Sequence, residues 1–176
     1  MTDWATLMRK SIDEFDLKIL SALQRLGRTT MSRLADTVGL SSSPCHARVQ
    51  RLTKDGVLGA FRPEVNLDKL TYSLTVIVPL ELKRHEARDF RAFEKILRIT
   101  PEIVECYAVG GGFDYILKVV TKDVGSFQNL MDNLLENEVG IARYYSYIVT
   151  KPIKKFTGFP LEELFSSRDE EQDESA

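Results

Sequence analysis

The sequence is poor in the residues that most often build catalytic and metal centres. Its 176 residues include two histidines and two cysteines. The two thiols, Cys45 and Cys106, match no paired metal-ligand spacing, and each lies in an apolar pattern, which favours buried reduced cysteines over a disulfide or redox pair. No nucleophile with a neighbouring base can be assembled from these side chains. We therefore expect no enzyme activity, no catalytic residues, no metal and no cofactor.

The chain also lacks long apolar runs. No stretch approaches the roughly 18 uncharged residues that cross a bilayer. The opening "MTDWATLMRKSIDEF" has neither the apolar core nor the small-residue cleavage site of a signal peptide. With 43% hydrophobic and 28% charged residues, the composition is that of an ordinary globular protein. The expected location is the cytoplasm, without a membrane partner.

Net charge is small overall, at -2, but it is unevenly distributed. Residues 1–61 carry nine basic and six acidic side chains, a net charge of +3, whereas residues 166–176 carry one arginine and five acids, a net charge of -4. A charge of +3 is by itself a weak signal of a polyanionic partner. The acidic end has almost no apolar residues, so the tail, residues 154–176, is predicted to be disordered beyond Gly158.

Apolar spacing of 3.6 residues predicts three short helices between residues 11 and 61, after an N-terminal arm of residues 1–10. The first starts at a possible capping box of Ser11 with Glu14 and ends at Gly27. The second follows Thr29 or Thr30 and ends at Gly39. The third leads from Leu40 to Gly56, with three residues facing inward: Cys45, Val49 and Leu52. Such an arrangement is a helix-turn-helix.

After Gly56 the apolar period shortens toward two. Residues 57–66, "VLGAFRPEVN", are predicted to form a short strand pair or wing, and residues 62–70 a hinge. Strands are predicted within 72–82, 103–111, 113–121 and 141–153, with helices at 86–99 and 123–137. This βαββαβ order over residues 71–153 indicates an α+β, ferredoxin-like sandwich. Both faces of the sheet are apolar, so we expect a second copy to cover the face without helices, giving a homodimer.

The start of the third helix, "SSSPCHARVQR", is suited to meet DNA. Amide groups and the positive dipole end of a helix N-terminus favour phosphate. With the apolar side inward, the outward residues carry the chemistry that reads base edges, and the basic ones that flank them suit phosphates. The alternative is a well-capped helix with a solvated basic face. The predicted DNA-contacting residues are Ser42, Ser43, His46, Ala47, Arg48, Gln50, Arg51 and Lys54.

These blocks resemble the Lrp/AsnC family of transcription regulators. The resemblance rests on "DEFDLKILSALQRLGR", "LADTVGLSSSPCHARVQRL" and "CYAVGGGFDYILKV", which occur in the family's order between about residues 12 and 152. It implies a winged helix-turn-helix domain joined to a RAM-type βαββαβ domain. It also implies dimers that assemble into tetramers, octamers or larger forms on double-stranded DNA. In the family, a small effector, typically an amino acid, binds between dimers.

The resemblance implies an effector site near the glycine turn and the facing strand. By position, its residues would be Tyr107, Val109, Gly110, Gly111, Gly112, Asp114, Tyr147, Ile148 and Val149. From the residues alone, turn amides could receive a carboxylate and Asp114 an ammonium group. The alternative is a tight turn in which Asp114 bonds local backbone groups.

The predicted function is therefore a sequence-specific, effector-responsive transcriptional regulator. The alternative function is a winged-helix protein-interaction or DNA-architectural module without an effector. Arg51→Ala is expected to weaken specific DNA binding by about 1–3 kcal/mol, whereas Lys54→Ala should mainly lower its salt dependence.

Overall fold

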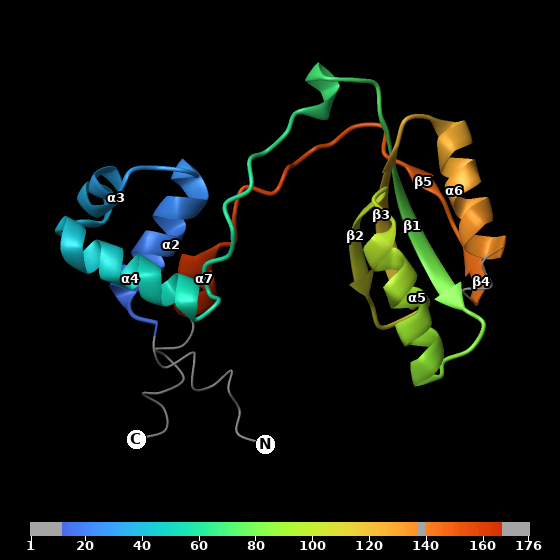
Figure 1. Ribbon diagram of the computed structural model, residues 1–176, viewed down its shortest axis with the longest axis horizontal. Helices are drawn as coiled ribbons and strands as arrows, with labels where there is room; N and C mark the ends of the chain where they lie inside the picture. The colour runs from blue at the N-terminus through green and yellow to red at the C-terminus, as the bar shows by residue number, and fades with distance from the viewer. Residues whose placement is uncertain (1–11, 137–139, 167–176) are drawn as a thin grey trace. The chain divides into compact units, whose positions relative to one another are not determined.

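The computed structural model describes residues 12–136 and 140–166, and the chain forms two compact units (Figure 1). The first unit contains the chain up to Pro63 and again from Lys154 onward. The second contains Glu64–Ile153. The predicted N-terminal arm lies outside the described residues, as does the acidic stretch after Ser166.

The first unit begins with helix α2, Glu14–Leu26, whose N-cap is Asp13. The Asp13 carboxylate accepts a hydrogen bond from the amide of Asp16 at 2.9 Å, and the Asp16 carboxylate accepts one from the amide of Asp13 at 3.1 Å. This reciprocal pair satisfies two amides that have no partner within the helix. The capping box predicted for Ser11 is therefore wrong, because the helix starts two residues later.

Helices α3 (Met31–Val38) and α4 (Ser42–Lys54) complete the helix-turn-helix (Figure 1). Thr30 caps α3, and Gly39 ends it with φ 72°, a left-handed conformation in which glycine is unstrained. The predicted strand pair at residues 57–66 is not present, since this segment is irregular up to the short 3-10 turn η1, Leu67–Lys69. The apolar residues of this segment alternate, but its backbone has no neighbouring strand with which to form a sheet. The core of the unit contains Ile19, Ala22, Leu23, Leu34, Ala35, Val38, Cys45 and Leu52.

The second unit is an antiparallel sheet in the order β2-β3-β1-β4. Its strands are β1 (Leu74–Leu82), β2 (Ile103–Ala108), β3 (Tyr115–Thr121) and β4 (Ile141–Tyr144). Helices α5 (Ala87–Ile99) and α6 (Val124–Glu136) connect them. This order is that of the predicted βαββαβ sandwich.

Both helices pack on one face of the sheet. Alternate residues of β1 and β3 are fully buried with residues of α5 and α6 in one core cluster: Val76, Val78, Leu80, Leu117, Val119, Phe93, Leu97, Phe127 and Met131. The residues between them point to the opposite face. This opposite face, which we call the open face, is formed by Thr75, Ile77, Glu105, Tyr107, Ile116, Lys118, Val120 and Tyr147.

The single final strand predicted for residues 141–153 is instead two short strands. After β4, the amide of Tyr145 donates to the carbonyl of Pro79 at 3.0 Å, and pairing resumes in β5, Tyr147–Ile148. A register shift between Glu81 and Leu82 accompanies β4. The chain therefore follows β1 along its whole length but changes register on the way.

The two cysteines differ in exposure. Cys45 is buried under α4, and this burial raises the pKa of its thiol. Cys106 is exposed on β2, so the prediction of two buried thiols is wrong for Cys106. The reason is that β2 lies at the edge of the sheet and has one neighbouring strand.

The C-terminal segment returns to the first unit and ends in helix α7, Leu161–Ser166 (Figure 1). The side-chain amide of Gln24 on α2 donates to the carbonyl of Phe159 at 3.2 Å and accepts from its amide at 2.7 Å. Disorder predicted from Gly158 onward is therefore wrong for residues 159–166. The two hydrogen bonds of Gln24 hold the segment against α2.

Replacing Gly158 by alanine is expected to release this segment. Gly158 has φ 138°, and an added Cβ would lie 2.9 Å from the side-chain oxygen of Gln24. Backbone strain of this kind costs about 1–3 kcal/mol. Amide hydrogen exchange in residues 156–166 should therefore become at least about fivefold faster.

Gly59→Ala is the matched control for Gly158→Ala. Gly59 does not have a positive φ, and an added Cβ meets nothing within 4 Å. Exchange that is unchanged in Gly158→Ala would show that the Gln24 contact does not hold the segment.

Candidate nucleic-acid interface and effector region

The apolar underside of α4 determines which residues face outward. Cys45 and Leu52 are fully buried, and Val49 packs partly buried against the same core. Ser41 is the N-cap of α4, but its hydroxyl accepts no hydrogen bond from the amides of the first turn. Six of the predicted DNA-contacting residues are exposed: Ser42, Ser43, His46, Ala47, Gln50 and Lys54.

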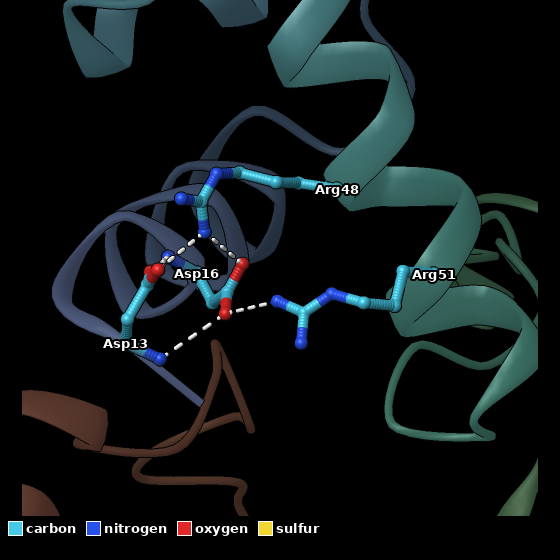
Figure 2. Close-up of polar contacts among 4 residues, drawn as sticks. All are labelled: Asp13, Asp16, Arg48 and Arg51. Atoms are coloured by element: carbon cyan, nitrogen blue, oxygen red, sulfur yellow. Dashed lines mark hydrogen bonds and ion pairs between the residues drawn. The ribbon is translucent and has the colours of Figure 1, made fainter. Parts of the chain in front are cut away.

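The other two predicted residues, Arg48 and Arg51, lie in an ion cluster with Asp13 and Asp16 (Figure 2). Arg48 donates from one nitrogen, Nη1, to Asp13 at 2.6 Å and to Asp16 at 2.9 Å. Arg51 donates to the second carboxylate oxygen of Asp16. We call these four residues the α2–α4 ion cluster, and they join the start of α2 to the middle of α4.

Burial distinguishes the members of this cluster. The Asp16 side chain is 0% exposed, whereas those of Arg48 and Arg51 are 27% and 37% exposed. A buried carboxylate is tolerated only when it is paired and hydrogen-bonded, and here each of its oxygens faces an arginine. The guanidinium of Arg48 also lies 5.6 Å from the ring centroid of Phe15. Both arginines are therefore held against α2, which their outward position in the sequence pattern did not indicate.

Asp13 and Asp16 were not among the predicted site residues. A signal was present, because Asp16 precedes Ile19 and Leu23 at helical spacing and so occupies the inward side of the first helix. A charged residue at an inward position requires a counter-ion. Arg48 and Arg51 are three residues apart on the third helix and could have been proposed as its partners.

Asp13 makes the stability of this cluster dependent on pH. Partial burial alone would raise the pKa of Asp13, but hydrogen bonds from Arg48 and from the amide of Asp16 hold that pKa below its ordinary value. As pH falls, the unfolded chain therefore binds the proton first. The stabilisation is present above about pH 4 and is lost as pH falls further.

We expect protection of α2 and α4 from hydrogen exchange, corrected for intrinsic rates, to decrease as pH falls from about 4 to about 2. Asp13→Asn keeps a capping side chain but removes the titrating charge, so its protection should change less over this range. An equally steep decrease in Asp13→Asn would assign the pH dependence to another group.

The glycine turn between β2 and β3 is closed by backbone hydrogen bonds. The amide of Val109 donates to the carbonyl of Asp114 at 2.9 Å, and the amide of Asp114 donates to the carbonyl of Leu80 at 3.0 Å. Gly111 has φ 128°, which favours glycine, whereas an added Cβ at Gly110 or Gly112 would meet nothing within 4 Å. The turn therefore needs glycine at one position, and the other two leave open space beside the backbone.

Asp114 makes local contacts in the folded chain. Its carboxylate accepts a hydrogen bond from the amide of Leu82 at 2.7 Å and lies 3.1 Å from Nε2 of His85. The local-bonding alternative given for Asp114 therefore describes at least part of its role. His85 was not predicted to lie here, because 29 residues separate the two in sequence.

The two predicted halves of the effector site bond to opposite edges of β1. Tyr147 pairs with Ile77, and the amide of Val149 donates to Thr75, on the edge of β1 opposite β3. The glycine turn reaches β1 at Leu80, three residues from Ile77 and so about 10 Å along the strand. The turn also approaches the segment that leads into β5, because the ring centroids of Phe113 and Tyr145 lie 5.7 Å apart.

The open face combines apolar and paired charged groups. Tyr107 and Tyr147 are 57% and 58% exposed, and Ile77 lies between them on β1. Lys118 donates to Glu105 at 2.7 Å, and the hydroxyl of Tyr107 donates to the same carboxylate at 2.9 Å. These two hydrogen bonds hold the pKa of Glu105 below its ordinary value. The charges on this face are already satisfied within one chain, which leaves its apolar groups available for contact.

Comparison with known proteins agrees with this geometry. Residues 12–58 match the family described as winged helix-turn-helix DNA-binding, and residues 75–159 match the Lrp/AsnC ligand binding domain. The transcriptional regulatory protein DoeX of Halomonas elongata is 46% identical over 144 residues, covering 82% of this chain and 91% of DoeX. The chain belongs to the Lrp/AsnC family of transcriptional regulators.

Two further comparisons extend this result. The leucine-responsive regulatory protein of Haemophilus influenzae is 36% identical, covering 83% of this chain and 88% of that protein. A transcriptional regulator of Neisseria meningitidis, solved in complex with L-Met, has a TM-score of 0.81 at 29% identity, covering 88% of this chain and 100% of that chain. This Lrp/AsnC chain therefore combines a helix-turn-helix DNA-binding domain with a ligand-binding domain. Among the described residues, no helix is long and apolar enough to cross a bilayer.

Proposed function

We propose that this Lrp/AsnC regulator binds a specific operator through α4 and responds to an amino acid bound between copies of its second unit. It would act in the cytoplasm as a regulator and not as an enzyme. The observation that supports this function best is the exposed face of α4, which lies opposite an apolar face anchored by the buried Cys45 and Leu52.

For DNA, we propose that the exposed residues of α4 enter the major groove. Gln50 offers an amide that can bond adenine in two places, and Ala47 can contact a thymine methyl group. Ser42 and Ser43 lie at the helix start, where hydroxyls and unpaired amides suit a phosphate. Lys54 is placed for a backbone phosphate. Two copies would read a palindromic operator.

For oligomerisation, we propose that the open faces of two chains pack together. An exposed apolar face of this kind favours association, and a symmetric dimer is the simplest arrangement that covers it. Further assembly of dimers, to tetramers, octamers or larger forms, would bring the glycine turn of one dimer near β5 of another. In this arrangement an effector would contact the glycine turn of one copy and β5 of another.

For the effector, we propose an amino acid held at the glycine turn. Open backbone amides at Gly110 and Gly112 suit its carboxylate, and Asp114 suits its ammonium group. A regulator solved with L-Met is similar to this chain over 88% of its length. Occupancy would change how dimers pack and so the spacing of paired α4 helices.

The test is selection of bound duplexes from a random-sequence DNA library, with and without a pool of the twenty amino acids. We expect a palindromic sequence to be enriched and the amino acids to change its affinity. Enrichment of no sequence at low ionic strength would contradict operator binding. An enriched sequence whose affinity no amino acid changes would contradict only the effector proposal.

A further inference from the structure

We propose that Asp16 is a positioning residue for DNA recognition. Its buried carboxylate holds the guanidinium groups of Arg48 and Arg51, and so sets how α4 presents its exposed residues to the operator. This inference rests on the proposed function, in which α4 reads DNA. It changes the expected role of Arg51, because the specificity attributed to Arg51 would depend on Asp16.

The first observation is geometric. Asp16 lies in the first turn of α2, and each of its two oxygens accepts from a different arginine of α4 (Figure 2). The arginines are three residues apart and therefore lie on the same side of α4. One rigid carboxylate thus fixes two points along the helix, which restrains its rotation as well as its distance from α2.

The second observation concerns the arginines themselves. An arginine has five N–H donors, and the hydrogen bonds of Arg48 to Asp13 and Asp16 use one nitrogen, Nη1. Both arginine side chains keep part of their surface exposed. An open hollow of about 430 Å³ is lined by Asp13, Pro44, Ala47, Arg48 and Arg51. The arginines can therefore stay bound to Asp16 while facing a DNA backbone beside α4.

The third observation is the charge balance. Two carboxylates and two guanidinium groups make the cluster neutral. The cluster therefore adds little net attraction for DNA of any sequence, because its acids offset its bases. What it contributes is fixed geometry, which sets the register and orientation in which the exposed residues of α4 meet base edges. Specificity and general affinity should consequently respond in opposite directions when Asp16 loses its charge.

The experiment uses the full chain with the Asp16→Asn substitution, which keeps the size of the side chain. Affinity is measured for the duplex selected by the wild type and for a shuffled duplex, each across a range of salt concentrations. We expect the ratio of the two affinities to fall about tenfold, a change within the range of one good base contact. Binding to the shuffled duplex should be equal or tighter, with a steeper salt dependence, because one acid has been removed.

The matched control is Asp36→Asn, which removes an exposed acid from α3 in the same unit. Both affinities should rise together in this control, with an unchanged ratio. If both affinities rise in Asp16→Asn with an unchanged ratio, as in the control, Asp16 affects DNA binding only through its charge. This result would overturn the inference. Affinities that fall in parallel, in proportion to an increased unfolded fraction, would overturn it in favour of a purely structural role.

Two further variants keep the inference testable if Asp16→Asn does not fold. Arg51→Lys preserves charge but cannot reproduce the planar contact, and Asp13→Asn removes one partner of Arg48. Both variants should lower the ratio of the affinities for the selected and the shuffled duplex. An unchanged ratio in both would overturn the inference. If Asp16→Asn folds, its effect should be non-additive with that of Arg51→Lys. A wild type that prefers no duplex would instead contradict the proposed function itself.

Discussion

Ile77→Glu is expected to convert the regulator into a monomer and to weaken operator binding by about a hundredfold or more. Ile77 points to the open face, between Lys118 on β3 and Tyr147 on β5, while its neighbours Val76 and Val78 are fully buried on the helix side. A carboxylate there would be buried without a partner in the proposed dimer, which costs several kcal/mol. A monomer would bind one half of a palindrome and lose the gain from linking two reading helices.

The measurement is sedimentation at several protein concentrations, followed by titration of the selected duplex. Ile99→Glu is the matched control, because Ile99 is 75% exposed at the end of α5 and does not belong to the open face. The control should remain a dimer and bind its operator normally. A dimeric Ile77→Glu variant would show that the open face is not the interface.

Periodicity was sufficient to predict most elements of both units. The three helices of the first unit and the βαββαβ order of the second follow from apolar spacing, and Thr30, Gly39 and Gly27 lie at the predicted helix ends. These features are local, so neighbouring residues determine them. The prediction of a strand pair at residues 57–66 was wrong because it used only local alternation of apolar residues. A strand also needs a neighbouring strand to pair with, and local alternation does not supply one.

Contacts between distant residues were harder to predict. Gln24 and Phe159 are 135 residues apart, and nothing in the sequence "FTGFP" names α2 as its partner. The pairing of Arg48 and Arg51 with Asp16 spans 32 and 35 residues. The outward direction of these arginines was inferred from the helix alone, but an arginine can bend toward a buried carboxylate on a neighbouring helix. Motif positions predicted that α4 faces DNA, whereas the restraint on its arginines became visible only in the packed structure.

In the effector region, too, the sequence indicated the segments but not the contacts between them. The family resemblance indicated the glycine turn and β5, and the chain places both beside β1 but on opposite edges of it. A sequence alone does not give strand neighbours, so it could not show that the two halves bond to opposite edges of β1. The contact of His85 with Asp114 also became visible only in the fold. A site shared between copies would link ligand binding to assembly, since each ligand would stabilise the packing that completes its own site.

Asp114→Asn is expected to weaken effector binding by about tenfold or more, because a hydrogen bond to a charged group contributes about 1.5–3 kcal/mol. The amide oxygen of asparagine can still accept from the amide of Leu82, which lies 2.7 Å from the carboxylate, so the turn should keep its shape. The negative charge that would face an ammonium group is lost. Calorimetry against each of the twenty amino acids identifies the ligand with the wild type and then measures its loss in the variant.

The control for this substitution is Asp132→Asn, the same chemical change at an exposed position of α6. Its binding heats should match those of the wild type. Unchanged heats in Asp114→Asn would leave Asp114 with the local role that its contacts with Leu82 and His85 already describe. Weakened amino-acid binding, together with operator affinity that no longer responds to the ligand, would place the ammonium contact at Asp114. It would also connect that contact to the assembly that spaces the α4 helices.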